Sequence, residues 1–193
     1  GGLKLYFEPE VGRVNIDERG DYLGLFDTND LVLHLKLDGS YELKNQDLIN
    51  KYNKDETYSV QFFSEGTPIN CVYYDGKSKN YYVKRFLIET TTLDKNFEFI
   101  SEHSKSKLHV ATTFPNSEIE ITRKTKSGEK ETEVIKLDDF IDIKGWKSVG
   151  NKLGGAEIFK IKLLSPKTIN PNELIKNKED SEESSSKDQT KLF

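Results

Sequence analysis

The chain has 193 residues, of which 34% are hydrophobic and 32% are charged, and its formal net charge is −4. This length suffices for one ordinary domain or for a small array of repeats, and no stretch approaches the ~18 consecutive apolar residues of a membrane-spanning helix. The acidic balance does not by itself indicate a nucleic-acid binder, so any anion-binding surface must be a local stripe.

Residues 3–166 consist of short aromatic and β-branched runs that end at Gly, Asn, Asp or Ser, which indicates strands and turns with almost no helix. We expect three hairpin units, at 21–43, 57–89 and 107–144. The strands expected within them are 22–26, 31–37 and 41–43, then 58–63, 69–74 and 81–88, then 108–113, 118–124, 132–137 and 140–144.

The turn glycines of these units are Gly39, Gly76 and Gly128, which are 37 and then 52 residues apart. Similar content at irregular spacing indicates diverged repeats of roughly 40–50 residues, the length of a four-stranded blade. The predicted fold is therefore an all-β array of about three to four blades. Residues 43–52 are expected to form a short helix or a loop, and 158–164 a closing strand.

After Pro166 the composition changes to Lys, Glu, Asp, Ser and Gln almost throughout. Such a segment buries too little apolar surface to offset its ordering entropy. We therefore predict one domain at 3–166 and a disordered polar tail at 167–193.

No pattern of residues indicates a catalytic or metal centre. The histidines His34, His103 and His109 stand at unrelated spacings, and His34 alternates with leucines on a strand, which predicts an exposed position. The single cysteine, Cys71, excludes an internal disulfide framework and is typical of a reducing cytoplasm. The chain contains no methionine, so we expect it to be part of a longer polypeptide.

The run YYVKRFLIE at 81–89 carries Lys84 and Arg85 next to each other in a strand. Neighbouring side chains alternate between the faces of a strand, so one of the two should point inward. Parity alone does not decide which one. Long cationic side chains can lie along a blade edge and present both charges to one track of phosphates, so both are candidate DNA contacts.

The run KGWKSVGNKLGG at 144–155 combines four glycines, the only tryptophan and the lysines Lys144, Lys147 and Lys152. It has two compatible interpretations: a blade connection that needs glycine at positive φ with Trp146 over the core, and a tight backbone whose lysines meet phosphates. Arg123 and Lys124 lie on a hairpin with glutamates nearby, which is typical of a solvated hairpin, and they complete the predicted DNA-binding set.

Three segments carry a family resemblance: GDYLGLFDTNDLVLHLKLDGSYEL at 20–43, INCVYYDGKSKNYYVKRFLIETT at 69–91 and DIKGWKSVGNKL at 142–153. Residues 3–164 resemble the C-terminal domain of the A subunit of bacterial type II DNA topoisomerases, and above all the topoisomerase IV form of the Bacteroidetes type. The resemblance implies a β-pinwheel whose basic rim binds and bends duplex DNA. The cleavage tyrosine and the ATP and magnesium sites of such enzymes lie on other domains or on the partner subunit. This chain is therefore expected to hold no catalytic residue, metal or cofactor.

Two features depart from that family. The glutamine-, arginine- and glycine-rich box with which gyrase wraps DNA is absent from this sequence. The three to four blades expected here are also fewer than those of the family's C-terminal domain. These two features favour a topoisomerase IV-like module that binds DNA without wrapping it. The sequence does not decide between topoisomerase IV and gyrase as the parent enzyme. The expected partners are duplex DNA, the rest of the A subunit and the B subunit, in the cytoplasm at the nucleoid and away from any membrane. The alternative is a β-propeller-like protein-interaction module that binds no nucleic acid.

Overall fold

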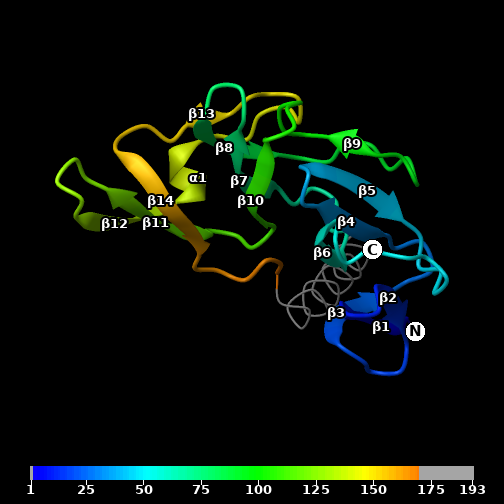
Figure 1. Ribbon diagram of the computed structural model, residues 1–193. Coiled ribbons are helices and arrows are strands. Elements are labelled where there is room, and N and C mark those ends of the chain that lie inside the picture. Colours follow the sequence, from blue (N-terminus) through cyan, green and yellow to red (C-terminus); the bar gives the residue numbers. More distant parts are fainter. Residues whose placement is uncertain (1, 170–193) are drawn as a thin grey trace, which may run out of the picture.

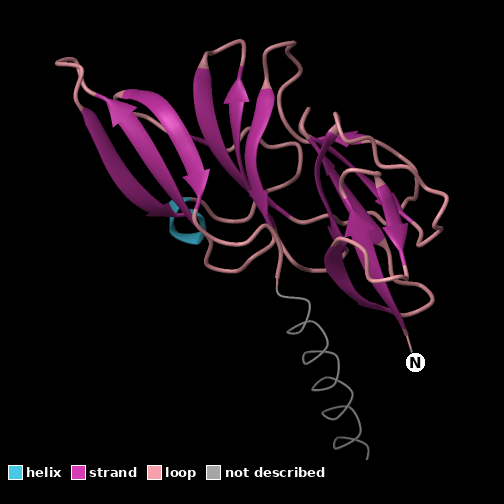
Figure 2. Ribbon diagram, turned by 60° about the horizontal axis from the view of Figure 1, so that its bottom comes forward, coloured by secondary structure: helices cyan, strands magenta, loops and turns pink. Residues whose placement is uncertain are grey.

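The computed structural model describes residues 2–169, so most of the predicted tail lies outside the described residues. The described chain forms four antiparallel sheets that stand next to one another (Figures 1 and 2). We call these sheets blades 1 to 4 in chain order. One helical turn, α1 (Leu137–Phe140), is the only α-helix among the described residues.

Each blade is built on a hairpin, and the next strand of the same blade pairs with the hairpin's first strand. Blade 1 has the order β2 (Arg13–Asn15), β1 (Leu3–Glu8), β3 (Asp21–Phe26). Blade 2 has the order β6 (Thr57–Phe62), β4 (Val32–Lys36), β5 (Ser40–Lys44), β9 (Phe97–Glu98). Blade 3 has the order β10 (Lys107–Thr112), β7 (Ile69–Asp75), β8 (Asn80–Phe86), β13 (Asn151–Lys152). Blade 4 has the order β12 (Lys130–Lys136), β11 (Glu118–Lys124), β14 (Glu157–Leu163).

The blades differ from the hairpin units expected from the sequence. The first strand of each expected unit belongs to the preceding blade: β3 pairs with β1, β6 with β4, and β10 with β7. The backbone groups of that strand form hydrogen bonds with the first strand of the preceding hairpin, whose outer edge would otherwise be unpaired. The residues next to the strand in the sequence do not indicate this partner. The expected strand at 140–144 is also wrong. Leu137 and Ile141, four residues apart, both enter the core through the turn of α1.

Neighbouring blades also exchange a short strand. The two-residue strand β9 lies in the chain between β8 and β10 of blade 3 but pairs with β5 of blade 2. In the same way β13 lies between β12 and β14 of blade 4 but pairs with β8 of blade 3. The exchange ties each inner blade to the blade that follows it.

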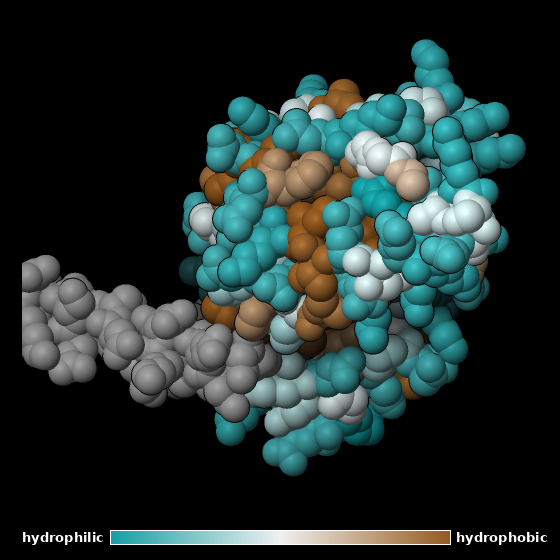
Figure 3. Space-filling view, turned by 90° about the vertical axis from the view of Figure 1, so that its left-hand side faces the viewer, coloured by the Kyte–Doolittle hydropathy of each residue, from teal (hydrophilic) through white to brown (hydrophobic). Residues whose placement is uncertain are grey.

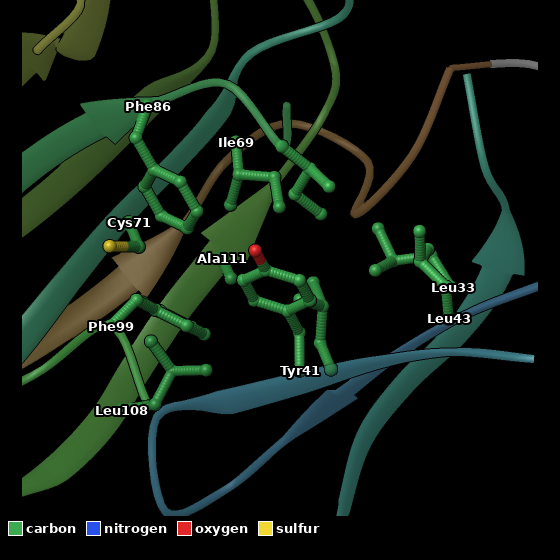
Figure 4. Close-up of a cluster of buried hydrophobic side chains, with 11 residues drawn as sticks. Leu33, Tyr41, Leu43, Ile69, Cys71, Phe86, Phe99, Leu108 and Ala111 are labelled. Carbon is green, nitrogen blue, oxygen red and sulfur yellow. The ribbon is translucent and has the colours of Figure 1, made fainter. Parts of the chain in front are cut away.

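Three apolar clusters fill the spaces between the four blades. The middle cluster joins blades 2 and 3 and contains Tyr41, Cys71 and Phe86 (Figure 4). Blades 2 and 3 are covered on both faces, so their strands do not alternate: the first five residues of β7 are all buried. The all-β fold is confirmed, with four blades, and residues 45–56 form a loop that contains no helix.

After β14 the chain returns along blade 3 to blade 2. The Pro166 carbonyl accepts a hydrogen bond of 2.6 Å from Thr112 Oγ1, and the Thr113 backbone N–H donates to the Lys167 carbonyl at 3.1 Å. The Lys167 ammonium donates to the Tyr58 carbonyl at 3.3 Å. The contacts of the folded body therefore extend past Pro166.

His34 does not lie on an exposed face. It is 3% exposed, because its strand β4 is covered by blade 1 on one side and blade 3 on the other. Its Nε2 is 2.8 Å from Thr57 Oγ1, and that hydroxyl donates to the Asn53 carbonyl. The proton on Nε2 must then point at Thr57, and Nδ1 is left buried without a partner. Burial lowers the pKa of His34 to about 4.

Candidate nucleic-acid interface

Lys84 is enclosed between blades 2 and 3. It lies opposite Cys71 in the β7–β8 ladder and is 1% exposed. Its ammonium donates hydrogen bonds to the carbonyl oxygens of Phe99, at 2.6 Å, and Trp146. Desolvation by the surrounding core lowers its pKa to about 8. The expectation that Lys84 presents its charge at a blade edge is wrong.

Arg85 points to the opposite face of the same strand, toward blade 4. Its Nε donates to Asn70 Oδ1 at 2.7 Å and its NH1 donates to the Ile141 carbonyl at 2.9 Å. A longer ion pair of 3.4 Å joins it to Asp138, and only 11% of the side chain is exposed. The guanidinium thus holds the α1 segment of blade 4 against blade 3.

The two cations of β8 therefore share one structural role. Blade 3 is covered on both faces, so each cation finds the unpaired carbonyl groups of an inter-blade connection: Lys84 on the blade 2 side and Arg85 on the blade 4 side. Buried ammonium and guanidinium groups need such partners, because an unpaired buried charge is very unfavourable. Neither side chain is free to meet a phosphate.

Arg123 is also engaged within the protein. It lies on the core-facing side of β11, where its Nε is 3.0 Å from Glu133 Oε1 and its NH1 donates to the Ala156 carbonyl at 2.7 Å. Only 15% of its side chain is exposed. Lys124, the next residue, points the other way and is exposed.

The glycine-rich connection at 144–155 shows the features that the sequence predicts for a link between blades. Gly150 and Gly155 have φ values of 91° and 92°, and a Cβ at Gly150 would collide with the Val83 carbonyl. Trp146 packs against the middle cluster and its ring meets Phe97 edge-on at 5.7 Å. The remaining candidates, Lys144, Lys147 and Lys152, are exposed on this connection.

A cleft of about 740 Å³ opens beside Lys147. Its lining mixes Lys77 and Lys95 with Glu98 and Glu102, and the pKa of Glu98 is raised because Glu102 lies beside it. Two neighbouring carboxylates repel a phosphate, so this cleft does not favour an anion.

A basic surface lies on the outward face of blade 4, which no other blade of residues 2–169 covers. On this sheet the buried residues Ile119 and Ile121 face blade 3, and the alternate positions face outward. The outward lysines, which we call the terminal lysine face, are all exposed: Lys124, Lys130, Lys136, Lys160 and Lys162. The outward glutamates of the same sheet are Glu118, Glu120 and Glu157.

Charge is divided unevenly along the chain. Residues 118–169, which include all of blade 4 and the glycine-rich connection, hold eleven Lys and Arg against nine Asp and Glu. Residues 1–117, which hold blades 1 and 2 and the β7–β10 sheet of blade 3 apart from β13, have fourteen against eighteen. The small excess of cations in residues 118–169 comes from Lys144, Lys147 and Lys152 of the connection and from Lys167, because the rest of this part holds seven Lys and Arg against nine Asp and Glu. The outward face of blade 4 is basic because five lysines stand on it against three glutamates.

The predicted DNA-binding set left out Lys130, Lys136, Lys160 and Lys162 of this face. A signal for the last two was present, because IFKIKLL places both lysines at period two, alternating with Ile161 and Leu163. A half-buried strand with such alternation presents its lysines to solvent.

The described part of the chain shows neither a membrane-spanning helix nor a metal site. No helix among residues 2–169 is long and apolar enough to cross a membrane. In the same residues, no three His, Cys, Asp or Glu side chains stand together as a possible metal site.

Four stacked four- or three-stranded sheets with exchanged edge strands define a β-pinwheel, and comparison with known proteins places the chain. The family described as "Topoisomerase C-terminal domain, Bacteroidota" matches residues 13–165, so the chain belongs to this family. The crystal structure of the C-terminal domain of DNA topoisomerase IV is similar in fold, with a TM-score of 0.55 and 13% sequence identity. The match covers 86% of this chain but only 61% of that one. No curated protein matches the sequence.

Proposed function

We propose that this chain is the non-catalytic module with which a topoisomerase IV-like A subunit holds duplex DNA, and that the terminal lysine face makes the phosphate contacts. The observation that carries the proposal is the gathering of five exposed lysines on the outward sheet face of blade 4, where they outnumber the three outward glutamates. The family membership supports it independently.

The contacts would not depend on base sequence. Direct readout of guanine relies chiefly on the planar fork of arginine, and phosphate contacts by lysine position DNA without reading it. All four arginines of the chain are engaged internally: Arg13 with the Ile49 carbonyl, Arg19 with Glu8 and Asp17, and Arg85 and Arg123 as described above. Exposed lysines are left as the surface cations, and DNA deformability would then set any preference.

The module would act for the whole enzyme. Strand passage, with its ATP and magnesium, would take place on the other domains of the A subunit and on the B subunit, at the nucleoid in the cytoplasm. A second candidate function is docking of a partner protein without nucleic acid. The excess of acidic residues in 1–117 favours it, because that part of the surface would attract a basic partner.

A binding titration separates these functions. Fluorescence anisotropy with a short duplex at 50 and 200 mM salt should show binding by the natural chain that weakens steeply with salt. Changing Lys160 and Lys162 to Glu should lower the slope of log affinity against log salt by ~1.8, about 0.9 for each phosphate that is no longer neutralised. The matched control changes Lys4 and Lys51, both exposed on the acidic part, to Glu. Equal losses of affinity from both pairs, or no binding at 50 mM salt, would reject DNA binding by this face.

A further inference from the structure

One large aromatic side chain stands among the cations of the terminal lysine face. Phe159 is 53% exposed, whereas its strand neighbours Ile158 and Ile161 pack against the core between blades 3 and 4. In the β11–β14 ladder Thr122 pairs with Lys160 and Arg123 pairs with Ile158, so Phe159 is the extra residue of a β-bulge. A bulge turns a side chain away from the direction that regular alternation would give it.

The ring of Phe159 is covered by lysines. The Lys130 ammonium lies 3.9 Å from the ring centroid and the Lys124 ammonium lies 5.7 Å from it. In the view of this end of the molecule, apolar surface runs between hydrophilic side chains (Figure 3). The immediate neighbours of the exposed ring are therefore positive charges.

This setting favours a polyanion over a protein as the partner. The centre of a protein–protein interface is depleted of charged side chains, whereas this ring touches two ammonium groups. Proteins that bind the minor groove combine cations with an apolar wedge, often Phe, that partly unstacks a base step and kinks the duplex. The outward face of blade 4 has both components, because lysines surround a projecting phenylalanine there.

We propose that Phe159 is a wedge that enters the minor groove of duplex DNA and bends it. This inference rests on the proposed function, in which the terminal lysine face contacts phosphates. Lys130 covers the ring in the free protein. When DNA arrives, its ammonium moves to a phosphate, since a charge-assisted hydrogen bond is stronger than an exposed cation–π contact. The ring is then uncovered beside the groove.

The test uses the full 193-residue chain and a short duplex with one central TA step, the kind of step that unstacks most easily. Fluorophores at the two ends report bending by energy transfer, and 2-aminopurine beside the TA step reports unstacking. Phe159→Ala should remove most of both signals, while Kd rises less than about threefold, because unstacking offsets most of what the ring contacts contribute. Phe159→Leu keeps an apolar wedge and should keep most of the bending. Replacing the TA step by an A-tract should weaken binding of the natural chain and not of Phe159→Ala.

The outcomes distinguish the wedge proposal from the proposal that the terminal lysine face binds DNA. Bending and 2-aminopurine signals that are unchanged in Phe159→Ala overturn the wedge and leave phosphate contact by the lysines standing. A loss of affinity as large as that of the Lys160→Glu/Lys162→Glu variant also overturns it, because the ring would then hold the DNA and not bend it. Failure of the natural chain to bind the duplex overturns both proposals.

Discussion

Acidification should destabilise this protein through one buried residue, His34. The imidazole is 3% exposed, its Nε2–H is used by Thr57, and its Nδ1 has no acceptor nearby for a second proton. Burial, helped by the nearby Lys36, lowers its pKa to about 4 from the ordinary 6.5. Between these two values the unfolded chain binds more protons than the folded one. The free energy of unfolding therefore falls as the pH falls through this window.

The size of the effect follows from the two pKa values. Between pH 7 and pH 5 the linkage relation gives a loss of about 2 kcal/mol in the free energy of unfolding. For a chain of this length such a loss corresponds to a melting temperature lower by roughly 4–8 °C. The variant His34→Gln keeps a hydrogen-bonding side chain for Thr57 and does not titrate, so its melting temperature should depend much less on pH in this range.

Thermal melts followed by circular dichroism at half-unit pH steps from 7 to 5 measure the difference between the two proteins. His109, whose pKa is also lowered by burial, is present in both and cancels. The carboxyl groups are the same in both proteins and cancel in the comparison as well. Parallel pH profiles for the natural chain and His34→Gln would refute the reasoning, since the natural protein would then lose stability through other groups.

Two further predictions concern the links between blades. Arg85→Met should lower the free energy of unfolding by about 2–4 kcal/mol, because Asn70 Oδ1 and the Ile141 carbonyl lose their donor, while duplex affinity measured well below the melting temperature stays the same. A weakened DNA affinity with unchanged chemical denaturation would show that Arg85 contacts DNA after all. Truncation after Ile169 should shift the melting temperature by no more than a degree or two, whereas truncation after Ser165 should lower it clearly by removing the Pro166 and Lys167 hydrogen bonds. Equal melting temperatures for both truncations would show that the Pro166 and Lys167 hydrogen bonds do not stabilise the fold.

Much of the local structure could be predicted from the residues. Ten of the fourteen described strands lie where an aromatic or β-branched run predicted them, because a strand needs only a few successive residues that fit a pleated, half-buried surface. The strands β1 and β2 of blade 1 and the two-residue strands β9 and β13 were not predicted. The turn at Gly39 was visible in the sequence, and so was the positive φ of glycines in the 144–155 connection. Both depend on backbone conformations that glycine adopts without strain.

Blade membership and the roles of the cations were decided only by the tertiary structure. Strand pairing is a non-local hydrogen-bonding choice, so nothing near β6 or β10 in the sequence shows that each completes the preceding blade. Parity correctly indicated that Lys84 and Arg85 point to opposite faces. It could not indicate that stacking of the blades covers both faces of blade 3 and so encloses both cations, whereas the lysines on the outward face of the last sheet stay exposed.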